Sequence, residues 1–119
     1  MNPAVNRKVL NELRALEAQG SSGFLAELID VFFREFSRHL KGLRRAIEEQ
    51  NAREAERLAH TMKGSSGNLG AEGLSRICAS LQEAAHAARW EILQGLMGQV
   101  ETEYERVRVE LQAERDRKS

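Results

Sequence analysis

The segment 24-FLAELIDVFFREFSRHLKGLRRAIEE-49 carries the strongest helical pattern of the chain. Its apolar residues recur every three or four positions and therefore lie along one stripe of a helix with 3.6 residues per turn. The members of this stripe are Leu25, Leu28, Ile29, Phe32, Phe36, Leu40, Leu43 and Ile47. A helix with a single apolar stripe packs that stripe against other elements, so the segment predicts a long helix of a helical domain.

The segment upstream predicts a shorter helix. Asn2 and Pro3 resemble an N-cap followed by a first-turn proline, and the helix is expected to end near Glu17. The glycine- and serine-rich segment 19–23 then predicts a break between this helix and the long one.

The segments downstream predict three more helices. Asn51 followed by Glu54 resembles a capping box, so a helix is expected to begin there and to stop near Gly70, a natural left-handed residue. Apolar periodicity predicts further helices over about 72–88 and 90–114.

These elements predict an all-α fold in one domain that spans residues 1–119. Long amphipathic helices joined by short loops favour an antiparallel up-down four-helix bundle, with a core over about 24–114. The short additional N-terminal helix is expected to cap one end of this bundle. The charged tail 114–119 is expected to fray.

Composition limits the classes of function. The 18 basic and 18 acidic residues balance, which argues against a nucleic-acid-binding protein. No apolar run is long enough for a signal peptide or a membrane span, so we expect a cytoplasmic protein that binds no membrane. The balanced charges and the capped bundle favour a monomer. The one cysteine, Cys78, lies among apolar residues at helical spacing and is expected to be a buried hydrophobe.

The chemically informative segment is 60-HTMKGSSGNLGA-71. On a helix with roughly 100° between residues, Leu58 and Met62 lie roughly 160° from His60, together with other small and apolar residues. That arc must face the core, so we expect His60 to point into solvent rather than to be a hydrogen-bonded core histidine.

Two glycines accompany His60 on the exposed stripe. Gly64 and Gly67 lie one and two turns further along, and each glycine inside a helix costs about 0.5–1 kcal/mol relative to alanine. A steric explanation fits best: a large partner approaches the imidazole along this side. Close packing of two helices is the alternative explanation for such glycines.

Lys63 can reach over the same surface, because residues three apart on a helix are neighbours. Its ammonium group suits a phosphoryl group carried on the imidazole of His60. A neutral imidazole is a nucleophile at physiological pH, and phosphoryl transfer needs mainly alignment and charge stabilisation.

The segment resembles the signature of histidine-containing phosphotransfer (HPt) domains, approximately His-x-Leu-Lys-Gly-Ser followed by a Gly-Ala pair. Met62 replaces the usual leucine, a change that conserves volume. The likeness extends over nearly the whole chain, since these domains also have a short leading helix and four further helices.

The resemblance implies roles for single residues. His60 is expected to be the phosphorylated residue, Lys63 to assist it electrostatically and Gly64 to admit the partner. Gln82 matches a position that often hydrogen-bonds the histidine ring, although an ordinary solvated glutamine is the alternative. His86 occupies a place where some relatives carry a basic residue, and no direct role is assigned to it.

The resemblance also implies partners. They are response-regulator receiver domains, which supply the aspartyl phosphate and the Mg²⁺, and a hybrid sensor histidine kinase is a further candidate. We expect Val9 and Leu13 of the first helix, together with the start of the second helix, to form the docking surface around Gly64, Gly67 and Asn68. No cofactor or metal is expected on this chain.

Other side chains have simpler interpretations. Ser65 and Ser66 are expected to bond back to helix carbonyls rather than to act as nucleophiles. His39 stands among basic residues and is expected to lie on a solvated basic face.

The sequence holds no nucleotide-binding motif, so we expect a phosphohistidine carrier without kinase activity of its own. The main alternative is a helical adaptor of the same fold that is not phosphorylated. A phosphoacceptor region cut from a larger histidine kinase is a second alternative. A bundle enzyme with a metal core is disfavoured, because the core stripes lack Glu-x-x-His pairs.

Overall fold

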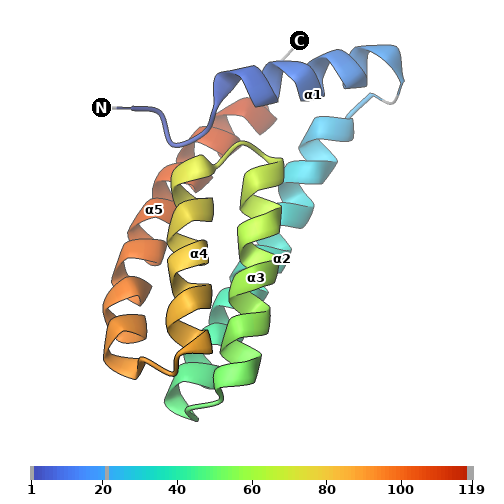
Figure 1. Ribbon diagram of the computed structural model, residues 1–119. Helices are drawn as coiled ribbons and strands as arrows, with labels where there is room; N and C mark the ends of the chain where they lie inside the picture. Colours follow the sequence, from blue (N-terminus) through green and yellow to red (C-terminus); the bar gives the residue numbers. More distant parts are fainter. Residues whose placement is uncertain (1, 21, 118–119) are drawn as a thin grey trace.

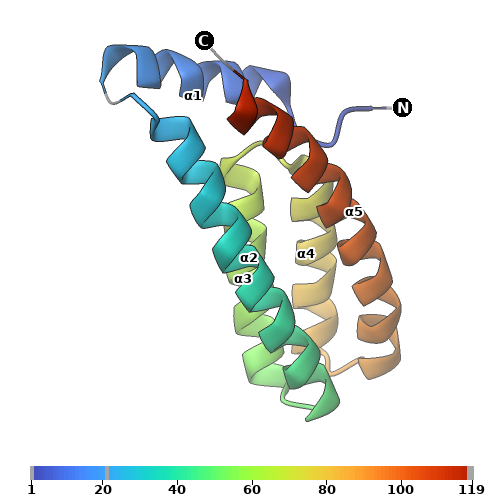
Figure 2. The ribbon, with the colours of Figure 1, turned by 180° about the vertical axis from the view of Figure 1, so that it is seen from behind.

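The computed structural model describes residues 2–20 and 22–117. Its helices, in chain order, are α1 (Arg7–Gln19), α2 (Phe24–Glu48), α3 (Ala52–Asn68), α4 (Glu72–His86) and α5 (Trp90–Asp116). The last four run alternately down and up, and α1 crosses one end of the bundle (Figure 1). Consecutive bundle helices pack together, and α5 closes the ring against α2 (Figure 2). The predicted all-α bundle with a capping helix is confirmed.

Apolar side chains from all five helices meet in one buried core. Within the predicted stripe of α2, only Leu28 is partly exposed. The ring of Phe36 stacks on that of Tyr104 with 4.5 Å between centroids, which joins α2 to α5. Because the stripe is continuous along α2, this helix contacts both of its neighbours over much of its length.

The first helix begins later than the sequence predicts. Asn6, not the Asn2–Pro3 pair, is the N-cap, and its side chain accepts from the backbone N–H two residues further on. The carboxylate of Glu110 on α5 accepts from the N–H of Val5 at 2.9 Å and from that of the preceding residue at 2.7 Å. These contacts hold the chain against α5, so the helix starts only after them.

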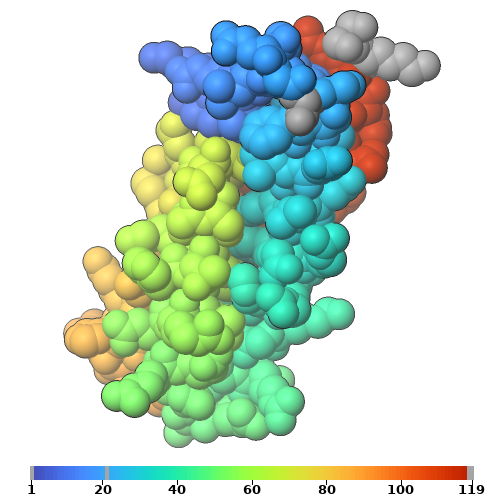
Figure 3. All heavy atoms as spheres, turned by 90° about the vertical axis from the view of Figure 1, so that its right-hand side faces the viewer, coloured from blue at the N-terminus to red at the C-terminus, as the bar shows by residue number. Residues whose placement is uncertain are grey.

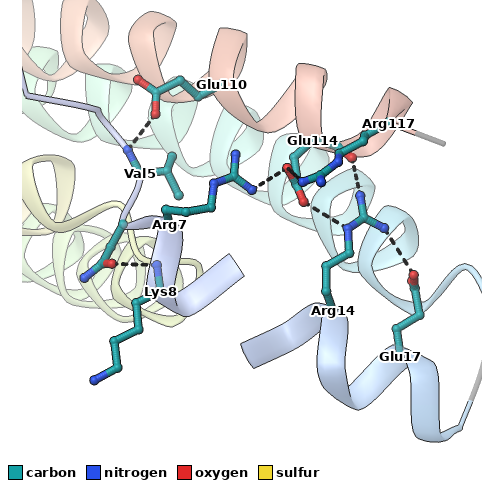
Figure 4. Close-up of polar contacts among 9 residues, drawn as sticks. Val5, Arg7, Lys8, Arg14, Glu17, Glu110, Glu114 and Arg117 are labelled. Atoms are coloured by element: carbon teal, nitrogen blue, oxygen red, sulfur yellow. Dashed lines mark hydrogen bonds and ion pairs between the residues drawn. The ribbon is translucent and has the colours of Figure 1, made fainter. Parts of the chain in front are cut away.

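The end of α5 also differs from the prediction. The helix continues to Asp116, and the side chain of Glu114 is only 1% exposed. Its carboxylate accepts from the guanidinium groups of Arg7 at 2.7 Å and Arg14 at 2.9 Å (Figure 4). The expectation that the chain frays from Glu114 is therefore wrong for this residue. The last two residues of that tail, 118–119, lie outside the described residues.

A second carboxylate joins the end of α1 to the start of α2. Glu17 accepts from the backbone N–H of Leu25 at 2.8 Å and from Arg14 at 3.2 Å. The N-cap of α2 is Gly23, which has no side chain to satisfy these first N–H groups. Glu17 satisfies one of them, that of Leu25, and so links α1 to the start of α2.

Across residues 2–20 and 22–117, no helix combines the length and the apolar character that crossing a membrane requires.

Candidate functional site

α3 turns His60 away from the core. Leu58, Ala59 and Met62 are 4%, 0% and 0% exposed, whereas the ring of His60 lies on the solvent side of the same helix. The predicted orientation is confirmed, and it follows from the 3.6-residue period of α3. The imidazole is therefore accessible to another molecule without any movement of the bundle.

The glycines beside His60 leave open space. A Cβ added to Gly64 would meet no atom within 4 Å, and one added to Gly67 would meet Ser75 Oγ at 3.6 Å, an ordinary contact. Neither glycine is needed for the packing of helices, so that alternative explanation fails. What remains is access, because any longer side chain on Gly64 would stand beside the imidazole.

Lys63 is anchored by its backbone and has a free head group. Its carbonyl accepts from Ser75 Oγ on α4 at 3.0 Å. Among the described residues, no acidic side chain forms an ion pair with its ammonium group. Lys63 lies one turn from His60, so its charge remains available to an anionic group carried on the imidazole.

Gln82 lies opposite His60 on the neighbouring helix. The register is fixed by His86 Nδ1 on α4, which lies 3.2 Å from Glu56 Oε1 on α3. Because Gln82 is one turn before His86 and His60 is one turn after Glu56, the antiparallel helices bring Gln82 and His60 to the same level. Within the described part of the chain no hydrogen bond joins them, so the orienting role of Gln82 stays a prediction.

The turn between α3 and α4 draws α1 towards the site. Gly70 has a φ of 80°, and the N–H of Ala71 donates to the carbonyl of Ser66 at 2.9 Å, as in a Schellman C-cap. The carbonyl of Gly70 accepts from the N–H of Asn6 at 2.8 Å. A Cβ on Gly70 would lie 2.9 Å from Val9 Cβ, so only glycine permits this approach. The predicted left-handed glycine is confirmed.

The residues predicted to dock a partner lie on two elements. Val9 and Leu13 are half-buried on α1, and Asn68 is exposed at the last residue of α3. The α2–α3 face with α1 across its top is seen in Figure 3. Sequence reasoning missed Leu16 and Val31, which are 58% and 43% exposed. Leu16 continues the helical spacing of Val9 and Leu13 along α1, and this periodicity places it on the same face of the helix.

The other candidate nucleophiles are engaged or inert. Ser66 is buried and donates to the carbonyl of Met62 at 2.7 Å, and Ser65 donates to the same carbonyl at 3.2 Å. Both serines thus bond back to the helix, as predicted. Burial raises the pKa of the Cys78 thiol to about 12, which keeps it protonated.

His39 does not lie on a fully solvated face, contrary to the prediction. It is half-buried on α2, and its Nδ1 is buried with no hydrogen-bond partner among the described residues. Burial, and then the positive charge of Arg38, lower the pKa of His39. The ring is neutral at physiological pH, but it is less accessible than that of His60.

The surface at His60 is open rather than enclosed. A cavity of about 640 Å³ lies between the N-terminal segment, α4 and α5, and its lining includes none of His60, Lys63 and Gly64. In the described segments 2–20 and 22–117, no group of three or more His, Cys, Asp or Glu side chains is placed to hold a metal ion. An exposed histidine beside open glycines suits contact with another macromolecule.

Comparison with known proteins identifies the family. A sequence model described as "Hpt domain" matches residues 27–110, a range that includes His60, Lys63 and Gly64. The chain belongs to the Hpt domain family. It is therefore a phosphorelay intermediate, as the likeness of its segment 60–71 implies.

Relatives and a solved structure support this membership of the Hpt family. Histidine-containing phosphotransfer protein 2 of Arabidopsis thaliana is 28% identical over 104 residues, which cover 85% of this chain and 67% of that protein. Protein 5 of the same plant is 28% identical over 105 residues, or 86% and 67%. The crystal structure of histidine-containing phosphotransfer protein B from Pseudomonas aeruginosa PAO1 matches with a TM-score of 0.87 and 28% identity, over 100% of both chains.

Proposed function

We propose that His60 accepts a phosphoryl group from the aspartyl phosphate of one receiver domain and passes it to another. The observation that carries this proposal is the exposed imidazole on the outer stripe of α3, next to the open space at Gly64. His39 and His86 are weaker candidates, since one is half-buried and the other contacts a carboxylate.

The transfer needs few groups on this chain. The lone pair of the neutral imidazole forms the P–N bond while the P–O bond to the receiver's aspartate breaks, and the bonding electrons leave with the carboxylate. Transfer to the next receiver reverses these changes. Lys63 stabilises the charge on the phosphoryl group through its ammonium group, one turn from the imidazole.

We expect the receiver domain to supply the rest of the chemistry. Its Mg²⁺ neutralises charge on the phosphoryl group, and no cofactor is proposed for this chain. Docking is proposed on Val9, Leu13, Gly67 and Asn68, around the open stripe of α3. A mixed surface of this kind suits a transient interface of modest area.

Gln82 is proposed to orient the imidazole. It lies opposite His60, and its amide can hydrogen-bond the inner ring nitrogen once the side chains adjust. The outer nitrogen would then keep its lone pair for the phosphoryl group. Gln82→Ala is expected to slow transfer and to leave the fold unchanged.

The chain is proposed to be a carrier without kinase activity of its own. Members of the Hpt family carry phosphoryl groups, and the upstream source is a receiver domain or a hybrid sensor histidine kinase. The alternative is an adaptor that binds partners with this surface and is never phosphorylated.

Label transfer distinguishes carrier from adaptor. Receiver domains of the source organism, charged with radiolabelled acetyl phosphate, are mixed with the wild-type chain and with His60→Gln. We expect acid-labile, base-stable label on the wild type and none on the variant. Binding of a receiver without any label on the folded wild type would favour the adaptor instead.

A further inference from the structure

An acidic side chain lies next to the proposed phosphorylation site. Glu56 is one turn before His60 on the exposed stripe of α3, where residues four apart are neighbours. Lys63 lies on the other side of His60, towards the end of the helix. Arg57, also one turn before His60, is paired with Glu54. The imidazole thus has the carboxylate of Glu56, the paired guanidinium of Arg57 and the ammonium group of Lys63 as charged neighbours on α3.

Glu56 is held by a residue of the neighbouring helix. His86 Nδ1 lies 3.2 Å from Glu56 Oε1 and 3.3 Å from Oε2, so the ring nitrogen faces both oxygens. The side chains are 78% and 38% exposed, and an exposed contact of this kind adds little stability. Its position beside His60 therefore matters more than its contribution to folding.

We propose that Glu56 sets how strongly the phosphotransfer site retains its phosphoryl group, because its carboxylate opposes retention of that group on His60. This inference rests on the proposed function. A phosphoryl group carries nearly two negative charges at neutral pH, and like charges one turn apart on a helix repel. The repulsion favours the step in which the P–N bond breaks and the receiver's aspartate forms the new P–O bond.

His86 is a positioning residue in this proposal. A hydrogen on its Nδ1, donated to the carboxylate oxygens of Glu56, draws that side chain towards α4 and offsets part of its charge. Loss of this contact lets the full charge of Glu56 act on His60. Removal of Glu56 and removal of His86 are therefore expected to change the equilibrium in opposite directions.

The test measures the equilibrium distribution of label between one receiver domain, charged with radiolabelled acetyl phosphate, and variants of this chain. Glu56→Gln is expected to increase the ratio of phosphorylated chain to phosphorylated receiver by about twofold to tenfold. Added salt should reduce this gain, because the interaction is electrostatic and close to solvent. A purely structural contact would show no such dependence on salt.

Glu105→Gln is the matched control. Glu105 also contacts an arginine three residues further on, Arg108, but it lies on α5, whereas α3 packs against α2 and α4. The ratio of phosphorylated chain to phosphorylated receiver is expected to stay within about twofold of the wild type for this variant. Distance and solvent weaken the interaction of its carboxylate with the phosphoryl group on His60. An equal ratio for Glu56→Gln and Glu105→Gln would overturn the proposal.

The double variant tests the role of His86. His86→Ala alone is expected to lower the ratio, whereas Glu56→Gln/His86→Ala should match Glu56→Gln, because His86 acts through Glu56. A lower ratio in the double variant than in Glu56→Gln would contradict that role. If no variant and no wild-type sample carries label, the proposed function itself fails, and the two failures are thus distinct.

Discussion

The junction of α1 with α5 and the surface around His60 use charged side chains in opposite ways. At the junction, Glu114 has a side chain that is 1% exposed and accepts hydrogen bonds from Arg7 and Arg14. At the other surface, His60 and Lys63 are one turn apart, and within the described residues neither side chain forms an ion pair.

This difference separates folding from function. A buried carboxylate must be paired, because an unpaired buried charge costs several kcal/mol, and its partners are then unavailable to other molecules. A cation or imidazole on the surface needs no partner in the folded chain and keeps its capacity to bind one. We therefore expect substitutions at the junction to affect stability, and substitutions near His60 to affect transfer.

The largest effect on stability is expected for Glu114→Gln. The free energy of unfolding should fall by about 1–3 kcal/mol, since Arg7 and Arg14 lose a charged acceptor in a partly buried setting. His60→Gln should change it by less than about 0.5 kcal/mol, as is usual for exposed positions. Urea unfolding of the two variants measures the comparison, and equal losses of stability would refute it.

The contribution of Glu114 should depend on pH. Burial alone raises the pKa of this carboxyl, but hydrogen bonds from Arg7 and Arg14 outweigh burial and bring the pKa below its ordinary value. A lowered folded-state pKa stabilises the fold above the unfolded-state pKa, and this stability is lost as pH falls through the folded-state pKa. The difference between wild type and Glu114→Gln should therefore shrink below about pH 4.3. Urea unfolding at several pH values checks this, and a difference that grows in acid would contradict it.

Replacing Gly64 or Gly70 by alanine should change the free energy of unfolding in opposite directions. Gly64→Ala should raise the free energy of unfolding by about 0.5–1 kcal/mol, because its Cβ meets open space in a helix. Gly70→Ala should lower it by more than about 1 kcal/mol, because its φ is 80° and its Cβ would meet Val9. Thermal unfolding measures both.

A larger side chain at Gly64 should affect phosphoryl transfer rather than stability. Gly64→Leu is expected to keep the fold and to slow transfer, since the side chain would obstruct the imidazole. Unimpaired transfer by a folded Gly64→Leu variant would show that access along this side is not required.

The smallest effect on stability is expected for Lys63→Ala. The free energy of unfolding should change by less than about 0.5 kcal/mol, because the ammonium group has no ion-pair partner among the described residues. The transfer rate should fall by about tenfold, the effect of about 1.4 kcal/mol of lost charge stabilisation. Rapid-quench measurement of label transfer tests this, with Lys41→Ala on α2 as the control. Transfer at the wild-type rate would remove Lys63 from the proposed mechanism.

Features that depend on local periodicity were predictable from the sequence. The stripe of α2, the outward orientation of His60 and the left-handed Gly70 all follow from residues within a few turns of one another. The same reasoning predicted the bundle, because amphipathic helices joined by short loops have few ways to bury their stripes.

Features that depend on distant residues were not predictable. Glu114 is 107 residues from Arg7 in the sequence. From the sequence alone it is predicted to belong to a solvated tail, because nothing local indicates its contact with Arg7. The start of α1 was misplaced for a similar reason, since Glu110 on α5 holds Val5 outside the helix. The contact of Glu56 with His86 spans 30 residues and likewise depends on the register of α3 and α4.

The position of the phosphoryl group tests the central claim most directly. The chain has 3 histidines, His39, His60 and His86, and each is a chemically competent acceptor. After transfer from a charged receiver domain, electron-transfer mass spectrometry of the intact chain locates the added mass. We predict that it lies on His60 alone. A phosphoryl group on His39 or His86, with His60 unmodified, would contradict the assignment of the site.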